Sequence, residues 1–244
     1  MRRKSAAIDA STLAVTPLDM SRPAAEQIAS ALKTAILNMK IAPGAMISEN
    51  EVGQVFGASR TPVREAFAQL RDDGLILTWP SRGNYVSRLS EHQIRSAQFV
   101  REALEVAVVE RLCADALPDD VVVELQDVLA RQGAAVVTDK KLDFQQLDDR
   151  FHTLLAEATG FDRIGGLLLR EKSALDRLRV LSLDDAAHMA RLLAEHEAIF
   201  EAIRNGSTEL AQEQMRRHLR RVLTTLSDLI EANREFCDIS EEDA

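Results

Sequence analysis

The chain has 244 residues, of which 46% are hydrophobic, 4% aromatic and 28% charged, with a formal net charge of −9. This composition is typical of a soluble globular protein with room for two ordinary domains. No apolar run approaches the ~20 residues of a transmembrane helix, so we expect no membrane partner and a cytoplasmic location. Cys113 and Cys237 lie far apart without the spacing of metal ligands, which indicates reduced thiols.

The charge is divided unevenly along the chain. Residues 1–90 hold 11 basic and 8 acidic side chains, a net of +3, whereas residues 91–244 hold 19 and 31, a net of −12. The overall acidity argues against a nucleic-acid-binding protein. The division removes that objection, because it leaves a basic N-terminal part that can bind DNA and places the acidic residues elsewhere.

A flexible arm over residues 1–20 and a small domain over residues 21–89 are expected at the start of the chain. The first helix of this domain is predicted to start at Ser21-Arg22-Pro23 and to end at Ala42-Pro43-Gly44. A short second helix is predicted from Ser48-Glu49-Asn50-Glu51, which has the pattern of a capping box.

The third helix is predicted from Ser59 to about Asp73, after a tight turn at Gly57-Ala58. Ser59 and Thr61 are good N-cap residues, and Pro62 is tolerated only in the first turn of a helix. Together the second and third helices have the spacing of a helix–turn–helix, whose second helix enters the DNA major groove.

Two short apolar runs follow over residues 75–87, separated by a turn that contains proline and glycine, and they predict a β-hairpin. A hairpin after a recognition helix forms a wing, with Arg82 and Gly83 placed to contact a groove or a phosphate. Arg60 and Arg64 lie four residues apart on one face of the third helix, where they can reach guanine edges or phosphates. Two solvated surface arginines are the ordinary alternative, but the flanking elements favour DNA binding.

Residues 22–88 closely resemble the winged helix–turn–helix of the GntR superfamily of bacterial repressors. The resemblance is carried by Ile36-Leu37, Pro43-Gly44, Ser48-Glu49, Ser59-Arg60, Pro62 to Ala66, Leu70, Gly74 to Ile76, Gly83 and Val86. Some relatives carry an arginine at the position of Asn50. The resemblance implies that double-stranded DNA is contacted by Ser48, Asn50, Ser59, Arg60, Thr61, Arg64, Arg82 and Gly83.

From residue 90 onward no strand pattern is present, and six amphipathic helices with short loops predict an all-α bundle. The helices are expected at about 91–115, 118–131, 142–158, 163–181, from a cap at Leu183-Asp184-Asp185 to Asn205-Gly206, and at 207–235. Gly133 is interpreted as the start of a loop. The predicted fold is mostly α: a winged helix–turn–helix with a small β wing, a helical domain over 90–236, and an acidic tail over 237–244.

One Asp and three His residues in the helical part form a candidate metal site. Asp148 and His152 are four residues apart on one helix face, and His196 and His218 lie in the middle of two later helices. If these helices are neighbours, the four ligands suit a first-row divalent ion such as zinc, nickel, manganese or iron and leave coordination positions open. Alternatively, each histidine is an ordinary core or surface residue, and Asp149 is a possible ligand in place of Asp148.

Residues 91–235 are similar to the FCD effector domain of the FadR branch of the same superfamily. The resemblance is carried by Arg101 to Glu105, Leu147-Asp148, Phe151-His152, Ala156 to Gly160, Glu195-His196, Ala202-Ile203 and His218-Leu219. It implies that Asp148, His152, His196 and His218 hold one divalent ion per chain, with zinc as the first choice. It also implies a small carboxylate effector at the ion, helped by Arg101. A structural salt bridge with Glu105 at i+4 is the alternative role for Arg101.

These observations predict a ligand-responsive transcriptional regulator, a repressor rather than an enzyme. A homodimer on a short inverted repeat is expected, because one helix–turn–helix contacts only a few base pairs. The alternatives are a metal-dependent enzyme fused to a DNA-binding domain, or a DNA-binding protein with a purely structural metal. No Ser/Cys–His pair, HExxH motif or glycine-rich phosphate loop supports the enzyme, and no extended basic tract supports an architectural protein.

Overall fold

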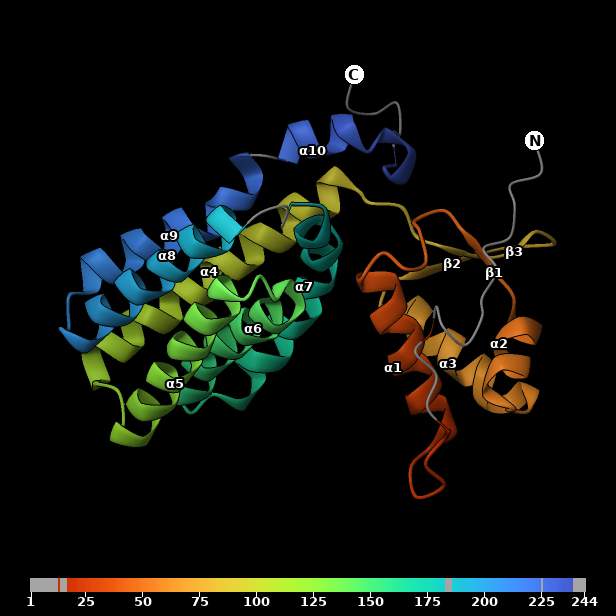
Figure 1. Ribbon diagram of the computed structural model, residues 1–244, viewed down its shortest axis with the longest axis horizontal. Coiled ribbons are helices and arrows are strands. Elements are labelled where there is room, and N and C mark those ends of the chain that lie inside the picture. The colour runs from red at the N-terminus through yellow and green to blue at the C-terminus, as the bar shows by residue number, and fades with distance from the viewer. Residues whose placement is uncertain (1–12, 14–16, 183–185, 225, 239–244) are drawn as a thin grey trace. The chain divides into compact units, whose positions relative to one another are not determined.

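The computed structural model describes residues 13, 17–182, 186–224 and 226–238 (Figure 1). Most of the predicted arm, the cap at Leu183-Asp184-Asp185 and most of the acidic tail lie outside these residues. The chain divides into two compact units. One contains the chain up to Gln93 together with Asp176–Val180 and the segment from Ile230, and the other contains Ile94–Leu175 and Leu181–Leu229.

The first unit is a three-helix domain with a small antiparallel sheet. Its elements are α1 (Ala24–Leu37), β1 (Met46–Ile47), α2 (Glu49–Phe56), α3 (Arg60–Asp72), β2 (Ile76–Trp79) and β3 (Gly83–Val86). The strand order is β1-β3-β2. The hairpin of β2 and β3 was predicted, but β1 was not, because a strand of two residues has no alternation of apolar and polar positions to detect.

Local capping explains the geometry of the helix–turn–helix. The Ser48 hydroxyl accepts a hydrogen bond from the Glu51 backbone N–H at 3.5 Å, and this confirms the predicted start of α2. The helix ends at Gly57, whose φ of +61° lies in the left-handed region that glycine adopts without strain. Ser59 is the N-cap residue of α3, but its side chain makes no capping hydrogen bond.

An apolar core holds α1, α3 and the sheet together. Ile28, Leu32, Val63 and Phe67 project from the two helices and are each no more than 1% exposed. Their spacing along the chain is that of one face of a helix. The opposite face of α3, which carries the arginines, is therefore left toward solvent.

The other helices are α4 (Glu91–Asp115), α5 (Asp119–Val137), α6 (Lys141–Ala158), α7 (Asp162–Ser182), α8 (Ala186–Arg204), α9 (Thr208–Thr224) and α10 (Leu226–Ala232), followed by a 3₁₀ turn at Arg234–Phe236. The mostly helical fold class is confirmed. The last predicted helix is found as α9 and α10.

The loop predicted at Gly133 is wrong, because α5 continues through it to Val137. A Cβ at Gly133 would lie 3.7 Å from Leu193 Cδ2, so packing against α8 outweighs the low helix propensity of glycine.

The core of the second unit is built by packing of α5 against α6 and α8, and of α8 against α9. Phe144, Phe151, Ile199 and Met215 are all at most 1% exposed within it. This packing brings the middle of α6, α8 and α9 together. Among the described helices, none combines the length and apolar character needed to cross a lipid bilayer.

The first residues of the predicted acidic tail pair with the end of the wing segment. The Leu89 N–H donates to the Phe236 carbonyl, and the Asp238 N–H donates to the Leu89 carbonyl, each at 2.8 Å. Cys237 thus forms a parallel bridge with Leu89. The strand-like pairing places residues 237 and 238 within the first unit rather than in a separate tail.

We expect Gly57→Ala to lower the free energy of unfolding of the first unit by about 1 kcal/mol, because alanine is strained at a positive φ. Gly165→Ala is the matched control. Gly165 lies inside α7, and a Cβ added there would meet no neighbouring group within 4 Å, so alanine should be neutral or stabilising by up to ~1 kcal/mol. Differential scanning calorimetry measures both changes, and equal stability of the two variants contradicts the proposed turn geometry.

Candidate DNA-binding surface and metal centre

The predicted DNA-contacting residues lie on the surface of the first unit. Asn50, Ser59, Arg60, Thr61, Arg64, Arg82 and Gly83 are exposed, and Ser48 is half-buried. Asn50 of α2 and Arg60 of α3 line one shallow depression, together with Gly53, Gln54 and Ala58. The structure therefore brings the exposed start of the third helix next to the exposed side of the second.

Local contacts hold the Arg64 side chain and the backbone of Arg82 on this surface. The Arg64 Nε lies 3.4 Å from Glu49 Oε2, so an acid at the start of α2 faces the predicted recognition helix. Arg82 lies in the turn between β2 and β3, where its N–H donates to the Trp79 carbonyl at 3.0 Å. The Tyr85 hydroxyl donates to the Arg82 carbonyl, also at 3.0 Å. These bonds hold the turn backbone and leave the Arg82 side chain exposed.

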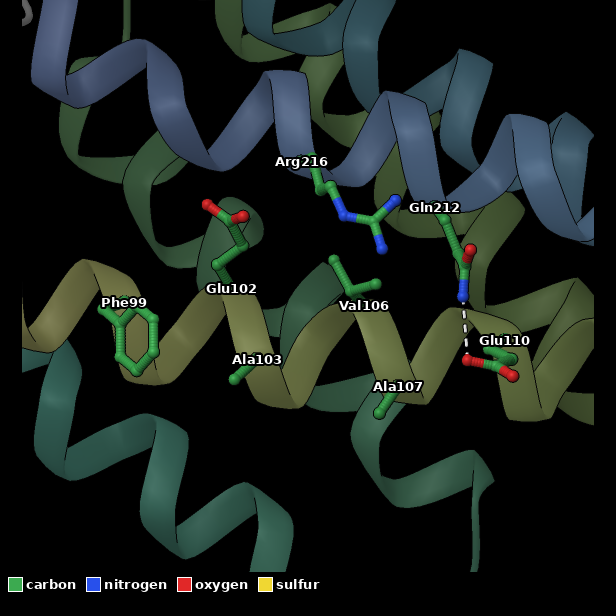
Figure 2. A pocket seen from close by; sticks show the side chains of 8 residues that line it. All are labelled: Phe99, Glu102, Ala103, Val106, Ala107, Glu110, Gln212 and Arg216. Carbon is green, nitrogen blue, oxygen red and sulfur yellow. Dashed lines mark hydrogen bonds between the residues drawn. The ribbon is translucent and has the colours of Figure 1, made fainter.

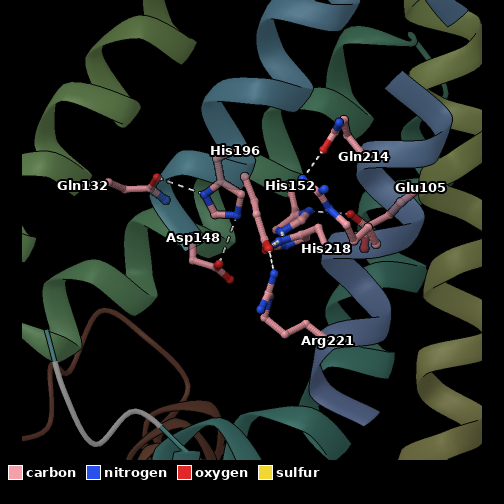
Figure 3. Close-up of polar contacts among 10 residues, drawn as sticks. Glu105, Gln132, Asp148, His152, His196, Gln214, His218 and Arg221 are labelled. Atoms are coloured by element: carbon pink, nitrogen blue, oxygen red, sulfur yellow. Dashed lines mark hydrogen bonds and ion pairs between the residues drawn. The ribbon is translucent and has the colours of Figure 1, made fainter. Parts of the chain in front are cut away.

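The four predicted metal ligands converge in the core of the second unit (Figure 3). Asp148 and His152 come from α6, His196 from α8 and His218 from α9, and one ligand atom of each lies within 4.8 Å of the others. All four side chains are buried. Nε2 of His152 is 3.2 Å from Nε2 of His218, and Nε2 of His196 is 3.4 Å from Asp148 Oδ1.

Each histidine has a hydrogen-bond partner at its other ring nitrogen. Nδ1 of His152 contacts Glu105 Oε2, Nδ1 of His196 contacts Gln132 Oε1 at 3.0 Å, and Nδ1 of His218 contacts Glu195 Oε2 at 3.0 Å. An oxygen acceptor at Nδ1 selects the tautomer that carries its proton there. The three Nε2 lone pairs are then directed to the common centre.

This donor set fits a divalent ion. With their protons on Nδ1, neither His152 nor His218 can donate to the other across the 3.2 Å between their Nε2 atoms. Two nitrogens bound to one zinc ion at ~2.0–2.1 Å with a tetrahedral angle lie about 3.3–3.4 Å apart. The Nε2–Nε2 and Nε2–Oδ1 distances of 3.2 and 3.4 Å match that spacing.

The charges around the centre favour the ligand forms. Burial raises the pKa of Glu105, but the positive charge of Arg101 and the contact with His152 outweigh it and lower the pKa to about 2. Burial also raises the pKa of Glu195, and bonds from His218 and Arg221 lower it below its usual value. Burial lowers the pKa of His218, so its neutral imidazole, the form that binds metal, is favoured.

Phe151 forms one wall of the centre. Its ring stacks on His196 with centroids 4.4 Å apart and meets His152 edge-on at 5.5 Å. Asp149, the alternative ligand, instead forms an ion pair with Lys172 at 2.6 Å. His92 is exposed, and neither it nor the half-buried His188 belongs to the cluster.

Arg101 lies next to the centre but does not reach it directly in the described contacts. Its Nε donates to Glu105 Oε1 at 2.7 Å, and both side chains are buried. The salt bridge that was considered as its alternative role is therefore present. Glu105 uses its second oxygen for His152, so a chain of contacts runs from Arg101 to a predicted ligand.

The residues that hold the histidines were not identified from the sequence. Glu105 was considered only as a partner of Arg101, Glu195 only as the neighbour of His196, and Gln132 not at all. Glu195 bonds to His218, which is 23 positions later on another helix. Spacing within one helix cannot reveal such pairs, because they depend on which helices are neighbours.

Two family models match the chain. The FCD domain matches residues 98–221, and the model of bacterial regulatory proteins of the gntR family matches residues 24–86. The chain is 34% identical over 221 residues to the HTH-type transcriptional repressor RspR of Escherichia coli K12, a match that covers 91% of this chain and 96% of that protein. It is 39% identical over 194 residues to an HTH-type transcriptional regulator in an unstable DNA locus of Streptomyces ambofaciens, covering 78% and 80%.

Solved structures share the fold. The structure of E. coli McbR/YncC has a TM-score of 0.71 at 16% identity, covering 86% of this chain and 98% of that one. A GntR-type transcriptional regulator from Rhodococcus sp. RHA1 has a TM-score of 0.68 at 24% identity, covering 86% and 99%. At these identities the likeness concerns the fold alone.

We expect the metal-free protein to bind one zinc ion per chain and to gain thermal stability. Binding to the folded state alone contributes ~2.7 kcal/mol when free zinc is at 100 times its Kd. His152→Ala should abolish this zinc-induced rise in Tm, whereas His92→Ala, at an exposed position outside the cluster, should retain it. Comparing Tm with and without zinc for each variant separates metal binding from any cost of the substitution itself. An undiminished rise in His152→Ala would contradict the site.

Proposed function

Because the chain belongs to the GntR family of bacterial regulatory proteins and carries an FCD domain, we propose that it is a ligand-responsive repressor whose operator affinity is changed by a small carboxylate bound at a divalent ion. The supporting observation is the buried Asp/His₃ cluster, whose Nε2 atoms face one centre in a chain that also has a winged helix–turn–helix. The relatives named above are transcriptional regulators, which favours regulation over catalysis.

Operator recognition is proposed to use the start of α3 in the major groove. Arg60 and Arg64 supply forked donors for guanine edges or phosphates, while Ser59 and Thr61 contact the backbone. Ser48 and Asn50 act from the start of α2, and Arg82 and Gly83 from the wing. The exposure of this surface supports the assignment. A homodimer on a short inverted repeat doubles the contact, since its two-fold symmetry matches that of the operator.

Zinc is the first choice for the ion, and nickel, manganese or iron are the alternatives. Three imidazole nitrogens and one carboxylate oxygen suit all four ions. Asp148, His152, His196 and His218 would hold it, and their four bonds would leave a position for a ligand when the ion takes five or six. The bound ion supplies a positive charge in a buried site, where an acid's oxygen binds well.

Arg101 is proposed to assist the effector. Its buried guanidinium has five N–H donors, and the bond to Glu105 uses the one on Nε. A carboxylate bound at the ion within reach of Arg101 can therefore pair with the remaining N–H donors of its guanidinium. Effector binding changes DNA affinity only if the acid prefers one arrangement of the helices that carry these groups.

We expect Arg60→Ala and Arg64→Ala each to weaken specific operator binding by about 1–3 kcal/mol, the value of a bidentate base contact. Arg71→Ala is the matched control, because Arg71 is exposed in the last turn of the same helix. Fluorescence anisotropy at fixed physiological salt measures the affinities. If Arg71→Ala weakens binding as much as the other two, the effect is one of net charge and the recognition assignment is wrong.

The metal switch is tested with His196→Ala combined with His218→Ala. The double variant should bind no metal by elemental analysis. Acetate, lactate, malonate and succinate are first tested on the unmodified protein. An acid that changes its operator affinity should leave the operator affinity of the double variant unchanged. Operator binding itself should persist, because the first unit carries the DNA contacts. A full response of the double variant to the same acid would show that side chains alone bind the effector.

Arg101→Gln should reduce the response while zinc is still bound.

A further inference from the structure

The three groups that contact the histidines at Nδ1 are not alike. Glu105 and Glu195 are carboxylates, whereas Gln132 of α5 is a neutral amide (Figure 3). An ionised carboxylate only accepts hydrogen bonds, while an amide accepts through its oxygen and donates through its nitrogen. Of the three partners, Gln132 alone can therefore bond to either tautomer of its imidazole.

Burial makes the orientation of this amide important. The Gln132 side chain is 0% exposed, and its Oε1 lies 3.0 Å from Nδ1 of His196. Its Nε2 is buried as well and has no hydrogen-bond partner among the residues that the structure describes. Buried N–H groups without a partner are rare, because the hydrogen bonds lost with water are not replaced. The orientation with the oxygen toward the imidazole therefore carries a cost, which a bound ion can offset by holding His196 in its ligand form.

The opposite orientation of the amide satisfies more groups when no ion is bound. Nε2 of His196 lies 3.4 Å from Asp148 Oδ1, close enough for a hydrogen bond when that nitrogen carries the proton. The unprotonated Nδ1 then accepts from the amide nitrogen of Gln132, which a half-turn of the amide places where its oxygen lay. One amide proton and the imidazole proton thus both gain an acceptor.

The His196 ring itself is held in place. It is 0% exposed, stacks on Phe151 with centroids 4.4 Å apart, and meets the His218 ring at an interplanar angle of 62° and a centroid distance of 4.7 Å. A ring packed between two others cannot turn over without displacing them. Reversal of the amide only exchanges an oxygen and a nitrogen of similar size. The amide is therefore the part of this pair that can turn.

We propose that Gln132 is a positioning residue whose amide reverses when the divalent ion binds or leaves, so that the proton of His196 moves between its two ring nitrogens. With the ion bound, Oε1 of Gln132 accepts from Nδ1–H, and the Nε2 lone pair of His196 is a ligand. Without the ion, the amide nitrogen donates to Nδ1, and Nε2–H donates to Asp148. The imidazole is neutral in both arrangements. The inference rests on the metal centre of the proposed function and names the residue that allows this buried centre to release its ion.

A second glutamine shows what fixes the orientation of an amide. Gln212 lies in a shallow groove between α4 and α9, where its amide nitrogen donates to Glu110 Oε2 at 2.8 Å (Figure 2). Because a carboxylate only accepts, this amide has one favoured orientation. An imidazole both donates and accepts, so Gln132 has two. Gln212, which lies outside the metal cluster, is therefore the matched control position.

Histidine NMR tests the exchange without any substitution. The chain has five histidines, so ¹⁵N-labelling of this residue type gives few signals, and protonated and unprotonated ring nitrogens have well-separated shifts. The His196 signals are assigned by their loss in His196→Asn. We expect the His196 proton on Nε2 in protein freed of metal by a chelator, and on Nδ1 in the zinc-bound protein. Nδ1 of His152 and of His218 should carry a proton in both states, because their carboxylate partners only accept.

Two substitutions at residue 132 separate positioning from packing. Gln132→Glu keeps the size of the side chain but only accepts, so His196 should keep its Nδ1 proton with and without zinc, and zinc should bind at least as tightly as in the unmodified protein. Gln132→Met fills the space without an acceptor and should raise the zinc Kd about 10–100-fold, the usual effect of losing such a partner. Gln212→Glu is the control and should leave both the tautomer exchange and the zinc Kd unchanged.

The outcomes separate this exchange from the proposed function. A metal-free His196 with its proton on Nδ1, or a metal-free protein that has lost its helical content by circular dichroism, overturns the exchange, while zinc binding by the same protein leaves the metal centre standing. Continued exchange in Gln132→Glu overturns the assignment to Gln132. An unmodified protein that binds no zinc, nickel, manganese or iron contradicts the metal centre and the exchange together.

Discussion

Three imidazoles and a carboxylate meet in the helical core, and each of these polar groups must have a partner to be buried there. An unsatisfied buried polar group costs about 1–3 kcal/mol. Glu105, Gln132 and Glu195 meet this requirement by accepting at the three Nδ1 positions. The same bonds turn the Nε2 atoms inward. The need to satisfy buried groups thus produces the geometry of a metal site.

The polar network continues beyond the histidines and connects the core to the surface. Glu105 is held by Arg101, which is buried, whereas Glu195 contacts Arg221, whose side chain is 36% exposed. Glu105, with a pKa of about 2, remains ionised throughout the neutral range. The centre is therefore surrounded by charges of both signs, which is the environment in which a bound cation and an incoming anion can both be accommodated.

Much of the first unit and the identity of the candidate ligands followed from the sequence. Turn and cap residues act over a few positions, so Ser48, Gly57 and Pro62 were sufficient to place the helix–turn–helix. Asp148 and His152 share one face of their helix because residues four apart always do, whichever element packs against that face. The pattern also put His196 and His218 in the candidate set if their helices are neighbours, and the resemblance to a known family favoured that grouping over unrelated histidines.

Tertiary structure decided everything that depends on neighbours far apart in the chain. It joined Asp148 rather than Asp149 to the cluster, because Asp149 turns to Lys172. It paired Glu195 with His218 and Gln132 with His196, and it kept Gly133 helical by packing against Leu193. Periodicity reports which face of a helix is buried but not what it is buried against. Local sequence therefore determined the elements and their candidate chemistry, while packing between helices determined which side chains meet.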